Sequence, residues 1–173
     1  MINYKQAKDI LIKSKIKIKD EIIDSSKSLN RINTLDIYSN VNYPAGTNAA
    51  FDGFAINSKE TIKLNKKNSK EFKILKTISA GDDPRLNKIK KNQTVEIMTG
   101  ALIPRFFDTI IPIEKIIFNK NKKYIKISEK IKKNQHIRYV GSDYKKKDLI
   151  IKRGIIIQPS HILAFKTLGI SKI

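Results

Sequence analysis

The feature that most constrains the fold is the change in hydrophobic spacing along the chain. Between about residues 71 and 157, short apolar runs alternate with polar residues and are separated by turns rich in Asn, Lys and Gly, as is typical of β-strands. Helical spacing follows possible N-caps at Asn3 and Ser160, near the two ends, and Gly169 is expected to end the second helix. The sequence therefore predicts a β-rich central module, with both ends of the chain contributing to a second, smaller module.

The individual elements are predicted to be short. A further helix is expected from Ser25 or Ser26, and residues 35–41 are expected to be extended. The last two predicted strands flank Lys152 and Arg153 and are expected to form a hairpin-like pair. The predicted strands are residues 71–78, 94–98, 109–113, 116–118, 124–127, 148–151 and 154–157.

The composition excludes several kinds of site. The chain has no cysteine, so it forms no disulfide and offers no thiolate ligand or Cys nucleophile. Only two histidines are present, which argues against a His-rich metal site, and His161 is interpreted as a capping or packing residue. No apolar run reaches the roughly 18 residues of a membrane span, and the first residues lack a signal pattern. We therefore expect a cytoplasmic protein that binds no membrane.

The net charge of +20 comes from 36 Lys and Arg against 16 Asp and Glu. Such an excess is typical of proteins that bind nucleic acid or another polyanion. However, 31 of the basic residues are lysine, whereas arginine is the residue suited to bidentate recognition of phosphates. The 33 Ile and 14 Asn, like Lys, have A/T-rich codons, so codon bias is the favoured explanation of the charge and nucleic-acid binding the alternative.

Glycines and carboxylates interrupt the apolar periodicity at four places. The first is Asp52-Gly53, within residues 48–56, where an Asp-Gly pair between apolar residues by itself predicts a hairpin turn. The second lies in residues 78–84 and is also typical of a turn. Turn formation alone therefore accounts for the residues at both places, and no functional role is needed to explain them.

The other two places carry polar groups suited to ligand binding. In the third, Thr99-Gly100 would let the backbone approach a ligand, with a hydroxyl and amides that could receive an oxyanion. A strand that ends in a Thr-Gly turn explains the same residues structurally. In the fourth, Arg138 and Asp143 could line a site or form a surface ion pair.

Taken in order, the four places resemble the amino-terminal half of the molybdopterin molybdenumtransferase family, which includes bacterial MoeA and the gephyrin E domain. The resemblance runs from about residue 14 to residue 173. Departures from the family pattern are Ala49, Phe51, Phe54 and Ser142, which replace Ser, Met, Tyr and Glu. The matches to the family motifs are residues 49–55 (Ser-Ala-Met-Asp-Gly-Tyr-Ala), 80–81 (Ala-Gly), 97–104 (Ile-x-Thr-Gly-Ala-x-x-Pro) with Asp108 and Glu114, and 137–143 (Ile-Arg-x-x-Gly-Glu-Asp).

The resemblance implies an α+β, β-rich fold. A central β-barrel-like domain of residues 43–146 would be inserted in a small α/β dimerisation domain formed by residues 1–42 and 147–173. The family continues into a domain that binds the adenylylated pterin, Mg²⁺ and molybdate, and then into a small barrel. Neither part is matched here, so the chain is expected to be truncated or split.

The resemblance also implies an active site shared between subunits, to which this chain contributes one side. Asp52 and Thr99 are expected to be catalytic: Asp52 would orient a water or an outer ligand of magnesium, and Thr99 would hold molybdate or phosphate oxygens. Mg²⁺ and molybdate would be held mainly by the absent domain, with no metal ligand in this chain. The expected substrate-binding residues are Gly53, Gly100, Ala101, Arg138 and Asp143.

Three functions are consistent with the sequence. The preferred one is molybdenum cofactor biosynthesis, in which the chain helps to insert molybdate into adenylylated molybdopterin as a homodimer or with a chain that carries the missing domain. The second is a non-catalytic dimerising scaffold, which the substitutions around Asp52 favour. The third is a basic nucleic-acid-binding domain, although the sequence lacks the paired aromatic residues of a stacking platform.

Overall fold

The computed structural model describes residues 1–14, 16 and 18–173, so Lys15 and Lys17 of the expected 1–42 segment lie outside the described residues. The chain divides into two compact units. The larger unit is Ser39–Asp148, and the smaller one combines Met1–Tyr38 with Leu149–Ile173. The larger unit is therefore an insertion within the smaller one.

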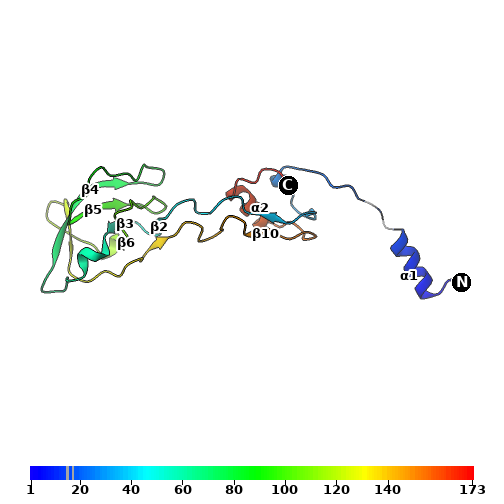
Figure 1. Ribbon diagram of the computed structural model, residues 1–173, viewed down its shortest axis with the longest axis horizontal. Coiled ribbons are helices and arrows are strands. Elements are labelled where there is room, and N and C mark those ends of the chain that lie inside the picture. The colour runs from blue at the N-terminus through cyan, green and yellow to red at the C-terminus, as the bar shows by residue number, and fades with distance from the viewer. Residues whose placement is uncertain (15, 17) are drawn as a thin grey trace. The chain divides into compact units, whose positions relative to one another are not determined.

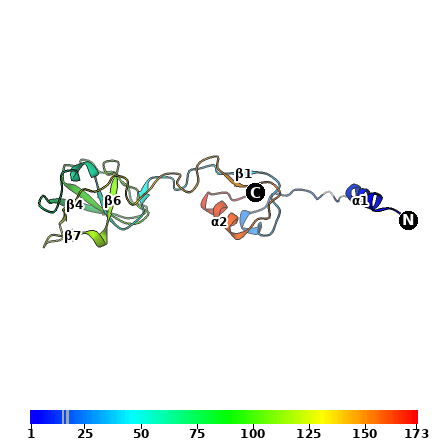
Figure 2. The ribbon, with the colours of Figure 1, turned by 90° about the horizontal axis from the view of Figure 1, so that it is seen from below.

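A six-stranded sheet forms the larger unit and curls into a half-barrel (Figures 1 and 2). Neighbouring strands are antiparallel except β4 and β5, which are parallel. Six of the predicted strands, five of them in this sheet, agree with observed ones to within one residue at each end, and the expected β-rich fold is confirmed. In spatial order the strands are β6 (Thr109–Pro112), β3 (Gly53–Ile56), β5 (Gln93–Ile97), β4 (Lys70–Ile78), β8 (Tyr124–Ile127) and β7 (Ile117–Phe118).

Strand β3 is the centre of the core because all four of its residues are buried. On one face of the sheet, Phe54 and Ile56 belong to an apolar cluster with Phe72. On the other face, Ala55 belongs to a second cluster with Val95. A strand that is covered on both faces shows no polar alternation. The sequence did not predict β3 because the Asp52-Gly53 pair at its start was interpreted as a turn.

The expected hairpin turn at Asp52-Gly53 is wrong. Gly53 is the first residue of β3, and a Cβ atom at this position would lie 2.0 Å from the carbonyl oxygen of Ile111 in β6. Glycine is therefore required because two strands pass close together, not because the chain reverses direction.

Short elements complete the larger unit. The two-residue strands β2 (Asn48–Ala49) and β9 (Ile137–Arg138) pair antiparallel, and Asn48 lies opposite Arg138. Two short 3₁₀ helices, η2 (Ser58–Thr61) and η3 (Ile113–Lys115), follow β3 and β6 respectively. The β2–β9 pair therefore brings residues 48–56, which contain Asp52-Gly53, next to residues 137–143, which contain Arg138 and Asp143.

In the smaller unit, helix α2 (Pro159–Thr167) contacts β10 (Leu149–Ile151) and the 3₁₀ helix η1 (Ser25–Lys27). Strand β10 pairs antiparallel with β1 (Ile37–Tyr38). The core of this unit consists of Ile151, Ile157 and Phe165. A short helix from Ser25 or Ser26 that carries Leu29 and Ile32 was expected, but the observed 3₁₀ helix begins at Ser25 and ends at Lys27, before both residues.

The two terminal helices differ in how well their starts were predicted. Helix α1 (Tyr4–Lys13) has the expected N-cap at Asn3. The expected N-cap at Ser160 is wrong, because α2 already begins at Pro159, whose fixed φ angle and missing N–H suit the first helical position. The N-cap is Gln158, and its backbone N–H donates to Nδ1 of His161 at 3.0 Å, which gives His161 a capping role.

The expected hairpin around Lys152 and Arg153 is also wrong. Strand β10 pairs with β1, while the carbonyl groups of Ile155 and Ile157 accept from the backbone N–H groups of Asn33 and Asn30. The two apolar runs therefore pair with different segments near the N-terminal end of the unit. Within the described part of the chain, no helix is both long and apolar enough to span a membrane.

Candidate functional site

The register of the central sheet brings Asp52 and Thr99 together. Asp52 immediately precedes β3, and Thr99 lies two residues after the end of β5. These strands are antiparallel neighbours in which Gly53 pairs with Ile97. The start of one strand and the end of the other therefore lie at the same edge of the sheet.

One carboxylate oxygen of Asp52 accepts two hydrogen bonds from Thr99. The backbone N–H and the side-chain hydroxyl of Thr99 both donate to Asp52 Oδ1, each at 2.7 Å. Both residues are solvent-exposed, and no described residue donates to the other oxygen, Oδ2. The hydroxyl and then the backbone N–H of Thr99 lower the pKa of Asp52 below its ordinary value, because both stabilise the carboxylate. Asp52 is therefore ionised at neutral pH and offers one oxygen to solvent.

The turn of residues 99–101 is held in place by bonds within the protein. The Gly100 N–H donates to the carbonyl of Ala49, and the Ala101 N–H donates to the carbonyl of Met98. Gly100 has a φ angle of +83° and is exposed, whereas Ala101 is fully buried. Because the Thr99 amide is also bonded, to Asp52, all three amides that were expected to receive an oxyanion already have partners inside the chain.

Arg138 and Asp143 form an ion pair within the fourth glycine-containing place. Nη2 of Arg138 contacts Oδ2 of Asp143, and the Ser142 hydroxyl donates to Asp143 Oδ1 at 3.1 Å. The Arg138 hydrogen bond lowers the pKa of Asp143, and the Asp143 hydrogen bond raises that of Arg138. The Arg138 guanidinium also lies 5.6 Å from the centre of the Tyr43 ring. Both charges are thus partnered, although each side chain stays about 40% exposed.

Residues 48–50 connect the two parts of the site. The Ala49 carbonyl accepts from Gly100 in the Thr-Gly turn, and the Ala50 N–H donates to the carbonyl of His136 on the segment that leads into Arg138. Residues 48–56, the Thr99-Gly100 turn and residues 137–143 thus meet around the loop that carries Asp52. The second place, Ala80-Gly81, lies close to the turn as well, since the Ala80 Cβ lies 3.6 Å from a Cβ placed on Gly100.

An aromatic pair that the sequence did not predict lies beside Asp52. The rings of Phe51 and His136 meet edge to face, with their centres 4.9 Å apart, and Phe51 is half exposed. His136 has a φ angle of +55°, in the left-handed region. In the sequence, the only sign of a role for His136 is that it directly precedes Ile137-Arg138, the start of the fourth family motif. Among the described residues, no three His, Asp or Glu side chains are grouped so that they could hold a metal ion.

Comparison with known proteins gives consistent results over almost the whole chain. The family model described as the MoeA N-terminal region (domain I and II) matches residues 2–169. A molybdopterin molybdenumtransferase from Staphylococcus epidermidis is 29% identical over 99% of this chain, and one from Haemophilus influenzae is 31% identical over 88%. The chain spans only 40% and 36% of these two proteins.

Solved structures show the same fold. The molybdopterin biosynthesis moeA protein from Pyrococcus horikoshii OT3 has a TM-score of 0.86 and 24% sequence identity. The match covers 100% of this chain and 45% of that one. The likeness therefore includes both units described above.

Proposed function

Because this chain belongs to the family of MoeA N-terminal regions (domains I and II), we propose that it takes part in inserting molybdate into adenylylated molybdopterin. In this proposal the loop with Asp52 and the Thr99 turn form one wall of the reaction site. The part of the relatives that this chain does not span supplies the rest of the site. The observation that carries the proposal is the ionised, exposed Asp52 carboxylate, which Thr99 fixes through two hydrogen bonds.

Asp52 acts as an acceptor in the proposed reaction. Its lowered pKa makes it a poor proton donor at neutral pH but a good hydrogen-bond acceptor. Oδ1 is occupied by Thr99, so Oδ2 is the oxygen that would bind and orient a water molecule beside the adenylate group. A fixed carboxylate does this better than a mobile one because the carboxylate itself loses no orientational freedom when the water binds.

Thr99 is a positioning residue in this proposal. Its N–H and O–H bonds both point to Asp52, and the next two amides are bonded within the chain. In this proposal the turn fixes Asp52, and the oxygens of molybdate or phosphate bind elsewhere. We assign those anionic groups, together with Mg²⁺, to the part of the relatives outside these residues, since the described residues contain no grouped set of metal ligands.

The test combines this chain with the remaining part of a molybdopterin molybdenumtransferase, either as a fusion or as a separate polypeptide. Release of adenylate from adenylylated molybdopterin is measured in the presence of molybdate and Mg²⁺. Asp52→Asn removes the charge and is expected to lower the rate about 100-fold or more. Asp83→Asn is the matched control, because Asp83 is also exposed and also bonded to a neighbour, Arg85.

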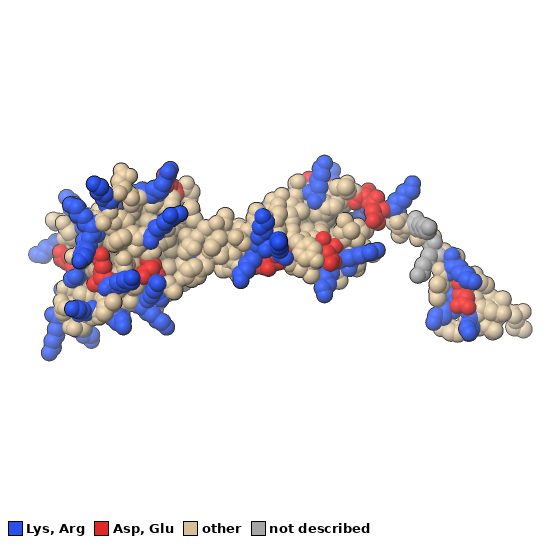
Figure 3. Space-filling model, in the orientation of Figure 1, with Lys and Arg blue, Asp and Glu red and all other residues tan. Residues whose placement is uncertain are grey.

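Two results would contradict the proposal. Equal rates for Asp52→Asn and the Asp83 control would remove Asp52 from the reaction. A chain that forms the complex but never supports adenylate release would instead support the scaffold hypothesis. On the face of the larger unit seen in Figure 3, Lys and Arg are spread out with Asp and Glu among them, and they do not gather into one basic patch.

A further inference from the structure

The larger unit contains a second feature with the properties of a binding site, on residues that the proposed reaction does not use. A cavity of about 490 Å³ lies between η2, the first residue of β4 and the segment just before β5. Its volume is within the range of small-molecule sites. Neither Asp52, Thr99, Arg138 nor Asp143 lines it. The lining residues are Asn57, Lys59, Glu60, Ile62, Lys63, Leu64, Asn68, Lys70, Lys91 and Asn92.

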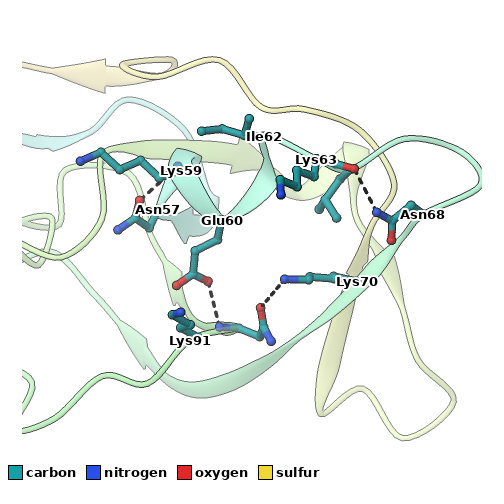
Figure 4. Close-up of a pocket in the computed structure, with 10 residues that line it drawn as sticks. Asn57, Lys59, Glu60, Ile62, Lys63, Asn68, Lys70 and Lys91 are labelled. Atoms are coloured by element: carbon teal, nitrogen blue, oxygen red, sulfur yellow. Dashed lines mark hydrogen bonds between the residues drawn. The ribbon is translucent and has the colours of Figure 1, made fainter.

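The charge of this cavity is strongly positive, with four lysines and one glutamate in its lining. Figure 4 shows that the side chains of Lys63, Glu60 and Lys70 reach toward the same open space, while the ammonium group of Lys59 points away from it. Among the residues that the structure describes, no carboxylate forms an ion pair with any of these four lysines. The cavity therefore contains positive charge that the protein does not neutralise.

Several hydrogen bonds hold the walls of the cavity in place. Oε2 of Glu60 accepts from the backbone N–H of Asn92 at 2.8 Å and ties η2 to the segment before β5. The Asn92 side chain accepts from Nζ of Lys70 at 3.4 Å, and the Asn68 side chain donates to the carbonyl of Lys63 at 3.0 Å. These bonds fix the two cavity segments that carry Lys63 and Lys70 relative to Glu60.

From this arrangement, we propose that the cavity binds a phosphate monoester of a hydroxylated molecule, such as a sugar phosphate. The ammonium groups of Lys63 and Lys70 would bind the phosphate oxygens by charge-assisted hydrogen bonds. Oε1 of Glu60, whose partner oxygen is bonded to Asn92, would accept from a hydroxyl of the ligand. The exposed side chain of Ile62 would cover an apolar part of the ligand.

The experiment is calorimetric titration of the chain, at 0.15 M salt, with ribose 5-phosphate, inorganic phosphate and ribose as separate probes. Ribose 5-phosphate is expected to bind saturably at one site and more tightly than either inorganic phosphate or ribose. The double variant Lys63→Gln/Lys70→Gln is expected to weaken its binding about tenfold or more. The matched control, Lys120→Gln/Lys123→Gln, removes the same charge from an exposed turn outside the cavity and is expected to change affinity less than about twofold.

Glu60→Gln tests the second half of the proposal. Glutamine can keep the bond to Asn92 but loses the charge, so binding of inorganic phosphate is expected to become tighter while the preference for ribose 5-phosphate shrinks. Equal weakening by the two lysine pairs would show attraction by the overall charge and overturn the site. Absence of saturable binding, or equal affinity for ribose 5-phosphate and inorganic phosphate, would overturn the assignment of a phosphate monoester. None of these readouts depends on the reaction proposed above.

Discussion

At the scale of single residues, the function proposed for this chain depends on a contact between two exposed side chains 47 positions apart. Thr99 donates twice to one oxygen of Asp52, and both bonds favour the ionised form of the carboxylate. The sequence could suggest both residues by family resemblance, but it could not show this bond. The bond depends on the pairing of Gly53 with Ile97, which is a property of the folded sheet.

Replacing Thr99 with valine tests this contact directly. Thr99→Val keeps the backbone donor but removes the hydroxyl, which is the larger cause of the lowered pKa. The pKa of Asp52 is therefore expected to rise toward its ordinary value of 3.8, as measured by NMR titration of the carboxyl carbon. Thr99→Ser restores a hydroxyl and is expected to restore the low pKa. An unchanged pKa in the valine variant would contradict the described contact.

The same contact predicts the direction of a pH effect on stability. Since the folded-state pKa of Asp52 is lowered, its contribution to stability is complete above the ordinary value of 3.8. The contribution is lost as the pH falls through the lowered value. Between pH 7 and pH 2, the stability of Thr99→Val is expected to fall less with acid than that of the parent chain, as measured by urea unfolding. An equal fall in both proteins would contradict this linkage.

Gly53 gives a prediction about close packing. Gly53→Ala would place a methyl group 2.0 Å from the Ile111 carbonyl oxygen, and backbone cannot move aside cheaply. The variant is expected to lose more than about 2 kcal/mol of unfolding free energy. Gly81→Ala is the control, because Gly81 has open space around it and a φ angle of +94°, so only the backbone strain of about 1–2 kcal/mol is added. A smaller loss at Gly53 than at Gly81 would contradict this explanation.

At the scale of elements, the sequence predicted strands that form distinct alternating or apolar runs between polar turns, including β6, which is buried at every position. Strands β4 and β8 each have exposed positions between buried ones, and their alternation is readable. Strand β3 was missed because the Asp52-Gly53 pair at its start was interpreted as a turn, and the two-residue strands β2 and β9 form no distinct apolar run. The predicted hairpin around Lys152 and Arg153 is wrong because the spacing of two neighbouring apolar runs does not show which segment each run pairs with.

The central role of β3 can be tested by comparing two phenylalanines that lie three residues apart. Phe54 is fully buried and packs edge to face on Phe118, with ring centres 5.7 Å apart, whereas Phe51 is half exposed. Phe54→Ala is expected to reduce the unfolding free energy by about 3–5 kcal/mol. Phe51→Ala is expected to cost less than about 1 kcal/mol. Urea unfolding of both variants measures the difference, and similar losses would show that β3 is not at the centre of the core.

At the scale of the whole molecule, the most unusual property is the net charge of +20 on 173 residues. Lys and Arg are scattered over the face of the larger unit seen in Figure 3, and the described residues contain only four ion pairs within 4.0 Å. Like charges on a compact unit repel one another, and unfolding relieves this repulsion. The charge therefore opposes folding whatever its biological origin.

Salt is expected to stabilise the chain for this reason. Raising NaCl from 0.02 to 0.5 M shortens the Debye length severalfold, so the repulsion between lysines is screened. The melting temperature is expected to rise over this range, as measured by differential scanning calorimetry. Sucrose at matched osmolality serves as the uncharged control and separates screening from general solvent effects. A melting temperature that falls with NaCl would show that attractive ion pairs dominate over repulsion.

The larger unit, Ser39–Asp148, begins and ends at points that lie next to each other. The Ser39 N–H donates to the Asp148 carbonyl at 2.8 Å, and the Lys147 N–H donates to the Ser39 carbonyl at 2.7 Å, so the two ends of the insertion are hydrogen-bonded to each other. A segment whose ends meet can be excised, circularised or transplanted with a very short linker. Recombination can thus exchange this half-barrel between host proteins as a cassette, and the surface around Asp52 can evolve while the host unit keeps its own core.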